Sequence, residues 1–193
     1  MSKMILLFKS HVKGYTRGNT YVQDHFRRAA KFAADKHKGQ MRKDGKTPYI
    51  AHPVQVASIL NREAKVIDHV ILLGALLHDT LEDTDTSFEE LKAEFGPEVA
   101  KLVQEVTNDP NLSELDSKTA QIAKQWSPRA IKLKIADKTA NLRDLVNAPP
   151  VGMHKDKKIE YADHARKVIE SMKEHPEALK RLFDLAYQRV LNH

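Results

Sequence analysis

The chain has 193 residues, of which 41% are hydrophobic and 30% charged, and its formal net charge is +6. This length suits a single domain with its own hydrophobic core. The sequence has no cysteine, which excludes disulfides, thiolate nucleophiles and cysteine-based metal sites, and we expect a reducing, cytoplasmic setting. No apolar run approaches the ~20 residues of a membrane span, and no basic run with interleaved aromatics is present. We therefore expect no membrane and no nucleic-acid partner.

The periodicity is helical from the first clear element onward. Thr20 begins a capping box and Gly39 marks a stop, which predicts a helix between them. A polar turn over residues 42–48 follows, with Asp-Gly and Pro as turn residues. His52 and Pro53 then mark a helix entrance, with the proline at the first helical position.

The next expected helix, residues 69–81 after a cap at Asp68, is apolar on almost every side, which is typical of a buried central helix. Further helices are expected over residues 88–95, 97–107, about 116–126, 128–146, 155–173 and 176–192. No strand pair, repeat or linker is evident. The sequence thus predicts an all-α fold of eight or nine helices in one domain.

Polar residues at the end of the most apolar helix are the first sign of chemistry. His78 and Asp79 end this helix, and Glu82 and Asp83 follow within one turn. Carboxylates this close cannot all ionise without a cation, and a buried charge is costly without a partner. A divalent metal ion resolves this conflict.

A second cluster lies in the helix that begins at Pro128. Asp137, Asn141 and Asp144 share one face of it, by spacings of four and three. Together with His52, the two clusters offer two imidazoles and two carboxylates for one ion, a set that suits Mn²⁺, Fe²⁺ or Zn²⁺. We interpret Asp144 as a salt-bridge partner of Arg143 or of a neighbour rather than a ligand. We interpret the remaining helix histidines of this region as surface or capping residues: His25, His37 and His69.

Three segments, in this order, resemble a known family. They are RKDGKTPYIAHP at residues 42–53, ALLHDTLEDT at residues 75–84 and KIADKTANLRD at residues 134–144. The pattern is similar to the H…HD…D signature of HD-domain metal-dependent phosphohydrolases. It more closely resembles the hydrolase domain of the Rel/Spo alarmone enzymes, over about residues 20–190. The chain is too short for their synthetase and regulatory domains, so it resembles a stand-alone small alarmone hydrolase of the metazoan Spo-like type.

The resemblance implies an all-α, single HD-domain helical bundle of about eight to ten helices, over residues 19–193, after an N-terminal tail of residues 1–18. It implies a guanosine-3′,5′-bis(diphosphate) 3′-pyrophosphohydrolase that converts (p)ppGpp to GDP or GTP and pyrophosphate. One Mn²⁺ ion per chain is expected, ahead of Fe²⁺ or Zn²⁺. The implied metal ligands are His52, His78, Asp79 and Asp137.

The resemblance also implies the groups that act on water and substrate. Glu82 and Asp83 match the pair that positions and deprotonates the attacking water. The matching substrate contacts are Arg42 on the base, Lys43, Asn141, Lys157 and Tyr161. Pro110 departs from the pattern, since the metazoan relative has a lysine there, and this leaves the base preference open.

The alternatives concern the substrate and the class of protein. An adenosine alarmone, (p)ppApp, or a nucleotide phosphomonoester such as the 2′-phosphate of NADPH could be hydrolysed at the same site. A non-catalytic alarmone sensor is the alternative of another class, although a sensor is expected to have lost ligands and all four are present. The partner expected is a small nucleotide, and the sequence leaves a homo-oligomer open.

Overall fold

The computed structural model describes residues 20–193, and within this range it is helical, with an isolated bridge between Met41 and Pro48 as its only extended pairing. The predicted tail, residues 1–18, lies outside the described residues. Ten α-helices and one π-helical turn confirm the expected all-α class. They are α2 Thr20–Lys36, α3 Ala51–Ser58, η1 Ile59–Glu63, α4 His69–Leu77, α5 Thr80–Asp83, α6 Phe88–Phe95, α7 Pro97–Val106, α8 Glu114–Ala123, α9 Pro128–Asn147, α10 Lys155–Glu170 and α11 Glu177–Asn192.

Local capping sets several of these boundaries, as the sequence predicts. The side chain of Asp68 accepts hydrogen bonds from the first turn of α4, Ser87 caps α6, and Ser127 caps α9. Gly96, at φ +87°, separates α6 from α7 in a conformation that favours glycine. One boundary differs slightly, because α3 begins at Ala51, two residues before the proline expected at its first position.

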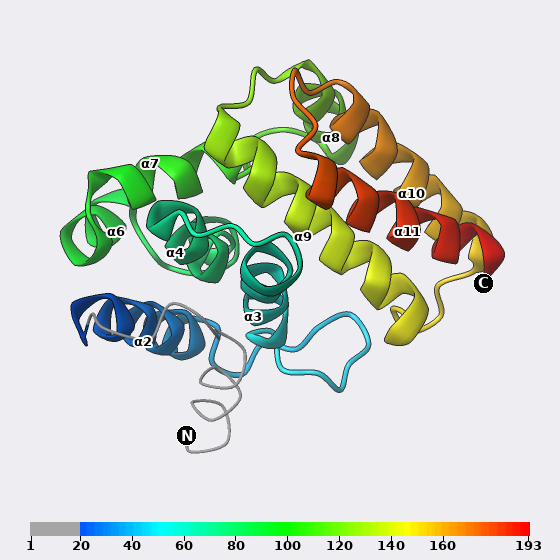
Figure 1. Cartoon of the computed structure of the whole chain (residues 1–193). Helices are drawn as coiled ribbons and strands as arrows, with labels where there is room; N and C mark the ends of the chain where they lie inside the picture. Colours follow the sequence, from blue (N-terminus) through cyan, green and yellow to red (C-terminus); the bar gives the residue numbers. More distant parts are fainter. Residues whose placement is uncertain (1–19) are drawn as a thin grey trace.

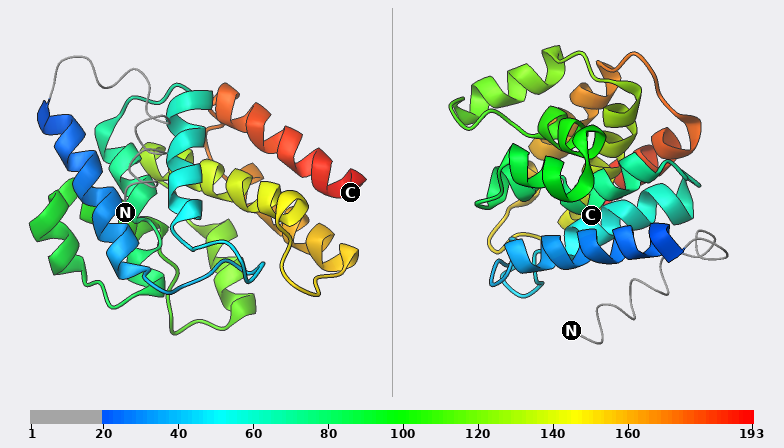
Figure 2. Two further views of the ribbon diagram at one scale, coloured as in Figure 1. Left: turned by 90° about the horizontal axis from the view of Figure 1, so that it is seen from below. Right: turned by 90° about the vertical axis from the view of Figure 1, so that its left-hand side faces the viewer.

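Helix α9 runs through the middle of the bundle, and α3, α4, α7, α10 and α11 all contact it (Figure 1). The C-terminal helices α10 and α11 lie on one side of α9, and α2, α4, α6 and α7 lie on the other. Helix α2 packs on α4 at the periphery (Figure 2). Among the described helices, none combines the length and apolar character needed to span a bilayer.

Helix α4 is the buried central helix that its composition predicts, with every residue from Ile71 to Leu77 buried. A side chain at Gly74 would place its Cβ only 2.8 Å from Cδ2 of Leu102 on α7. Glycine therefore lets α4 and α7 approach closely at this point. The same Cβ would lie 3.5 Å from Cδ2 of Leu133, so α4, α7 and α9 meet at this point.

The predicted helix over residues 69–81 is wrong at its end, because α4 stops at Leu77. Asp79 adopts φ −95° and ψ −4°, and a separate helix, α5, begins at Thr80. The Thr80 hydroxyl donates to the carbonyl of Leu77 at 2.7 Å and satisfies one of the acceptors that the break leaves free. Neighbouring side chains of a continuous helix point about 100° apart. The break instead turns His78 and Asp79 toward one centre.

Candidate metal centre and adjoining cavity

Two histidines and two aspartates meet where α3, the α4–α5 junction and α9 converge. Nε2 of His52 lies 3.3 Å from Asp137 Oδ1 and 3.7 Å from Asp79 Oδ2. Nε2 of His78 lies 3.1 Å from Asp79 Oδ1 and 3.8 Å from Asp137 Oδ1. The structure therefore brings together all four residues that the sequence suggests as metal ligands.

The donor set fits a divalent cation. His52, His78 and Asp137 are buried, and each offers a ligand atom within 4.8 Å of the other two. Nδ1 of His78 contacts the carbonyl of Ala75 at 2.9 Å, an arrangement that fixes the ring and leaves Nε2 facing the centre. Although Asp79 Oδ1 lies 3.1 Å away, this buried Nε2 makes no well-aligned hydrogen bond within residues 20–193. Nitrogen and oxygen donors without sulfur match Mn²⁺, Fe²⁺ or Zn²⁺.

The electrostatics of the cluster also favour a cation. Burial by itself lowers the pKa of His78, but the charges of Asp79 and Asp137 outweigh burial and raise this pKa to about 9. For Asp137, burial raises the pKa, whereas Lys134 and His52 hold it well below its ordinary value. The site thus keeps both carboxylates ionised and attracts positive charge.

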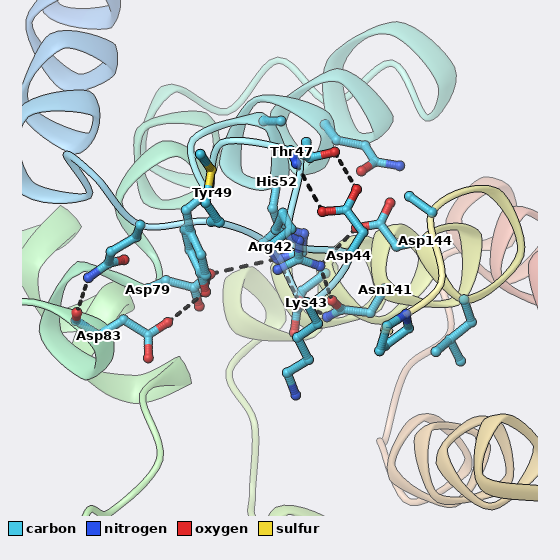
Figure 3. Close-up of a pocket in the computed structure, with 18 of the residues that line it drawn as sticks. Arg42, Lys43, Asp44, Thr47, Tyr49, His52, Asp79, Asp83, Asn141 and Asp144 are labelled. Atoms are coloured by element: carbon cyan, nitrogen blue, oxygen red, sulfur yellow. Dashed lines mark hydrogen bonds and ion pairs between the residues drawn. The ribbon is translucent and has the colours of Figure 1, made fainter. Parts of the chain in front are cut away.

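Tyr49 connects the cluster to the acidic pair beyond it (Figure 3). Its hydroxyl lies 2.8 Å from Oδ2 of Asp79 and 2.6 Å from Oδ2 of Asp83. Its ring stacks on His37, with centroids 4.5 Å apart. His37 is buried, so its interpretation as a surface residue is wrong. It directly follows α2, in the capping position, where its backbone N–H donates to the carbonyl of Ala33 at 2.9 Å and its ring supports Tyr49.

Glu82, the other member of the acidic pair, is held from a different segment. Its two carboxylate oxygens accept hydrogen bonds from the backbone N–H and the side-chain amide of Asn108, each at 3.0 Å. The side-chain oxygen of Asn108 in turn accepts from Gln121 on α8 at 3.0 Å. The loop after α7 thereby fixes the orientation of Glu82.

A cavity of about 690 Å³ opens beside the centre. Its wall includes the expected ligands His52, Asp79 and Asp137 and the acidic pair Glu82 and Asp83. Of the expected substrate contacts, the following also line it: Arg42, Lys43, Asn141 and Tyr161.

Arg42 is fixed inside this cavity by two acceptors from α9. Its guanidinium donates to Asn141 Oδ1 and Asp144 Oδ2, both at 2.8 Å (Figure 3). Asn141 also donates to Asp137 Oδ1 at 2.7 Å, so one amide joins Arg42 to the metal centre. Asp144 is a salt-bridge partner, as the sequence suggests, but of Arg42; Arg143 pairs with Glu63 at 2.7 Å.

Lys157 is the one expected contact outside the cavity wall. Its exposed ammonium pairs with Glu160 on the same helix at 2.7 Å. Its role as a phosphate contact stays a prediction.

Sequence reasoning missed Tyr49, Asn108 and two buried lysines of α9, Lys134 and Lys138, which line the cavity. A signal was present for some of them. Tyr49 precedes His52 by three residues, and Lys134, Lys138 and Asn141 follow one helical face by spacings of four and three. Nothing in the sequence marks Asn108, because its contact with Glu82 depends on the fold.

Known proteins match most of this chain. Residues 29–168 match the HD-domain family. The guanosine-3′,5′-bis(diphosphate) 3′-pyrophosphohydrolase MESH1 of Mus musculus is 47% identical over 163 residues, which cover 81% of this chain and 91% of that protein. The bifunctional (p)ppGpp synthase/hydrolase SpoT of Escherichia coli is 41% identical over 132 residues, covering 64% of this chain and 18% of that protein.

A solved structure shows the same fold. It is described as "A metazoan ortholog of SpoT hydrolyzes ppGpp and plays a role in starvation responses", and it superposes with a TM-score of 0.83 at 39% identity. The match covers 89% of this chain and 98% of that one.

Proposed function

The chain belongs to the HD-domain family and, within it, to the small alarmone hydrolases, and we propose on this basis that it hydrolyses the 3′-pyrophosphate of (p)ppGpp. The observation that carries the proposal is the convergence of His52, His78, Asp79 and Asp137 at the edge of a cavity with two further carboxylates. The protein is then a metal-dependent hydrolase with a small nucleotide as its substrate.

The four converging residues would hold the metal ion, and we propose Mn²⁺. A divalent ion at such a site supplies Lewis-acid stabilisation of phosphoryl charge and lowers the pKa of a water molecule. Asn141 and Tyr49 hold two of the carboxylates in place, since they donate hydrogen bonds to Asp137 and Asp79. Such outer contacts orient ligands and preserve the geometry of the site.

We assign the attack on phosphorus to water activated by the acidic pair. Asp83 and Glu82 both line the cavity, and a carboxylate there accepts the proton that the attacking water loses. The new bond joins the water oxygen to the phosphorus attached to the 3′ oxygen. The bond between this phosphorus and the 3′ oxygen breaks, and the 3′ oxygen takes up a proton. The products are GDP, or GTP, and pyrophosphate.

The nucleoside end of the substrate is assigned to the loop of residues 42–48. Arg42 presents a guanidinium fixed by Asn141 and Asp144, and a planar cation held in this way can stack on a base. Tyr161 lines the same cavity, and burial raises its pKa above the ordinary value, so its hydroxyl stays protonated. A cytoplasmic location is proposed from the composition, and oligomeric state stays a prediction.

A product assay tests the function. Metal-stripped protein is incubated with ppGpp, with ppApp and with NADPH, each with and without Mn²⁺, and the products are separated by anion-exchange chromatography. The proposal predicts Mn²⁺-dependent release of GDP and pyrophosphate from ppGpp. Faster turnover of ppApp would move the base preference to adenine, and orthophosphate released from NADPH alone would indicate a phosphomonoesterase. Binding of ppGpp without turnover, with metal bound, would favour the sensor.

A further inference from the structure

The cationic side chains of the cavity differ in whether they have a partner. Arg42 is paired with Asp144 at 2.8 Å. Lys134 is buried but contacts the carbonyl of Val106 at 3.3 Å and lies 3.6 Å from Asp137 Oδ2. Lys43 is exposed at the cavity mouth, where water solvates its charge.

Lys138 has neither an ion-pair nor a hydrogen-bond partner among the described residues, and its side chain borders the open cavity. Only 7% of its surface is exposed, and it lines the cavity. Its ammonium lies 5.6 Å from the ring centroid of Tyr161, a cation–π contact that compensates burial only in part. Within residues 20–193, no carboxylate lies within 4.0 Å of this ammonium, and no hydrogen bond satisfies it. A cation that lines a cavity without a counter-ion attracts an anion that arrives with a ligand.

The backbone of α9 places this charge beside the metal centre. Lys138 follows Asp137 directly, and it shares a helical face with Lys134 and Asn141, which also line the cavity. An anion bound at Lys138 therefore lies next to whatever the metal centre holds.

We propose that Lys138 forms an anion subsite that binds the outer phosphate of the substrate's 3′-pyrophosphate. The identity of this anion rests on the proposed function, whereas the subsite itself rests on the burial and isolation of the ammonium. For attack, the phosphate attached to the 3′ oxygen must lie at the metal centre, so the outer phosphate extends along the cavity wall beyond it. The 5′ phosphates lie across the ribose, toward the loop that carries Arg42 and Lys43.

Each of the two products represents one end of the substrate, so their binding can be measured separately and without turnover. Inorganic pyrophosphate and GDP are each titrated into Mn²⁺-loaded protein by calorimetry. Lys138→Gln is expected to weaken pyrophosphate binding by about 10- to 100-fold, the loss typical of one hydrogen bond to a charged group. GDP binding is expected to change less than about twofold, because its phosphates belong to the 5′ end.

Lys132→Gln is the matched control. It removes the same charge from the same helix, but Lys132 does not line the cavity. It is expected to leave pyrophosphate affinity unchanged. Lys138→Arg, which keeps the charge, should retain most of the affinity and also covers the case in which Lys138→Gln fails to fold.

Thermal unfolding distinguishes a binding role of Lys138 from a purely structural one. Lys138→Met removes an unpaired buried charge, so the ligand-free variant should melt no lower than the unmodified protein. Stabilisation by pyrophosphate should be lost in the same variant.

Unchanged pyrophosphate affinity in Lys138→Gln would overturn the subsite, and so would a loss confined to GDP. A ligand-free Lys138→Met that melts lower while binding pyrophosphate normally would also overturn it. Failure of the proposed function gives a different pattern: pyrophosphate binding that depends on Lys138 in a protein that does not hydrolyse ppGpp.

Discussion

The hydroxyl of Tyr49 lies between two carboxylates of different expected roles, 2.8 Å from Asp79 and 2.6 Å from Asp83. Burial and the charge of Asp79 raise the pKa of Tyr49 far above its ordinary value, so the hydroxyl remains a donor at any working pH. Tyr49→Phe removes this single oxygen. The ring is retained, and its stack on His37 is expected to persist.

The size of the effect follows from the one proton that this hydroxyl shares between the two carboxylates. A hydrogen bond to a charged group contributes about 1.5–3 kcal/mol, and 1.4 kcal/mol corresponds to a factor of ten. Outer contacts of metal ligands typically change metal affinity or activity by about 10- to 100-fold. For Tyr49→Phe we expect the Mn²⁺ dissociation constant to rise about tenfold and kcat at saturating Mn²⁺ to fall about 10- to 100-fold. KM for the nucleotide should stay within about threefold, since Tyr49 acts on the carboxylates.

Metal binding is measured by calorimetric titration of metal-stripped protein with Mn²⁺, and kcat and KM are then measured at saturating metal. Tyr187→Phe is the control, because its hydroxyl makes a similar bond to Asp163, at 2.6 Å, away from the cavity. This control should keep its metal affinity and its kcat. If Tyr49→Phe binds Mn²⁺ and turns over like the unmodified protein, the hydroxyl does not position the site and the reasoning fails.

Three further predictions concern the same site. Asp79→Asn should abolish both Mn²⁺ binding and turnover, whereas Glu82→Ala should bind Mn²⁺ normally and lose rate; a fully active Asp79→Asn would refute the metal centre. Asn108→Ala removes one of two donors to Glu82 and should lower kcat about tenfold at unchanged metal affinity, as measured by steady-state kinetics. An unchanged kcat would contradict this role of Asn108. Thr47→Val removes the hydroxyl that, with two backbone donors, lowers the pKa of Asp44 to about 2. Ionised Asp44 therefore favours the fold above pH about 4, a contribution lost as the pH falls toward 2; an NMR titration of the variant should show this pKa moving up toward 3.8.

The amino-acid sequence by itself determined the elements that depend on neighbouring residues. Caps such as Asp68 and Ser127 satisfy the first N–H groups of their own helices, so they act over three residues. The run of apolar residues after Asp68 marks a buried helix without reference to any partner. His78, Asp79 and Asp137 could also be recognised as candidate metal ligands, because their residue types and spacing are given by the sequence itself.

Only the tertiary structure decided how the charges of the site are distributed. Arg42 pairs with Asp144, 102 positions later in the chain, and Asn108 reaches Glu82 across 26 positions. Lys157 has the residue type of a phosphate contact but faces outward, whereas Lys138, of the same type, is buried without a partner. The physical reason is that burial and pairing depend on which distant segments pack together. The charge of a side chain is a property of its residue, but the free energy of that charge is set by its surroundings.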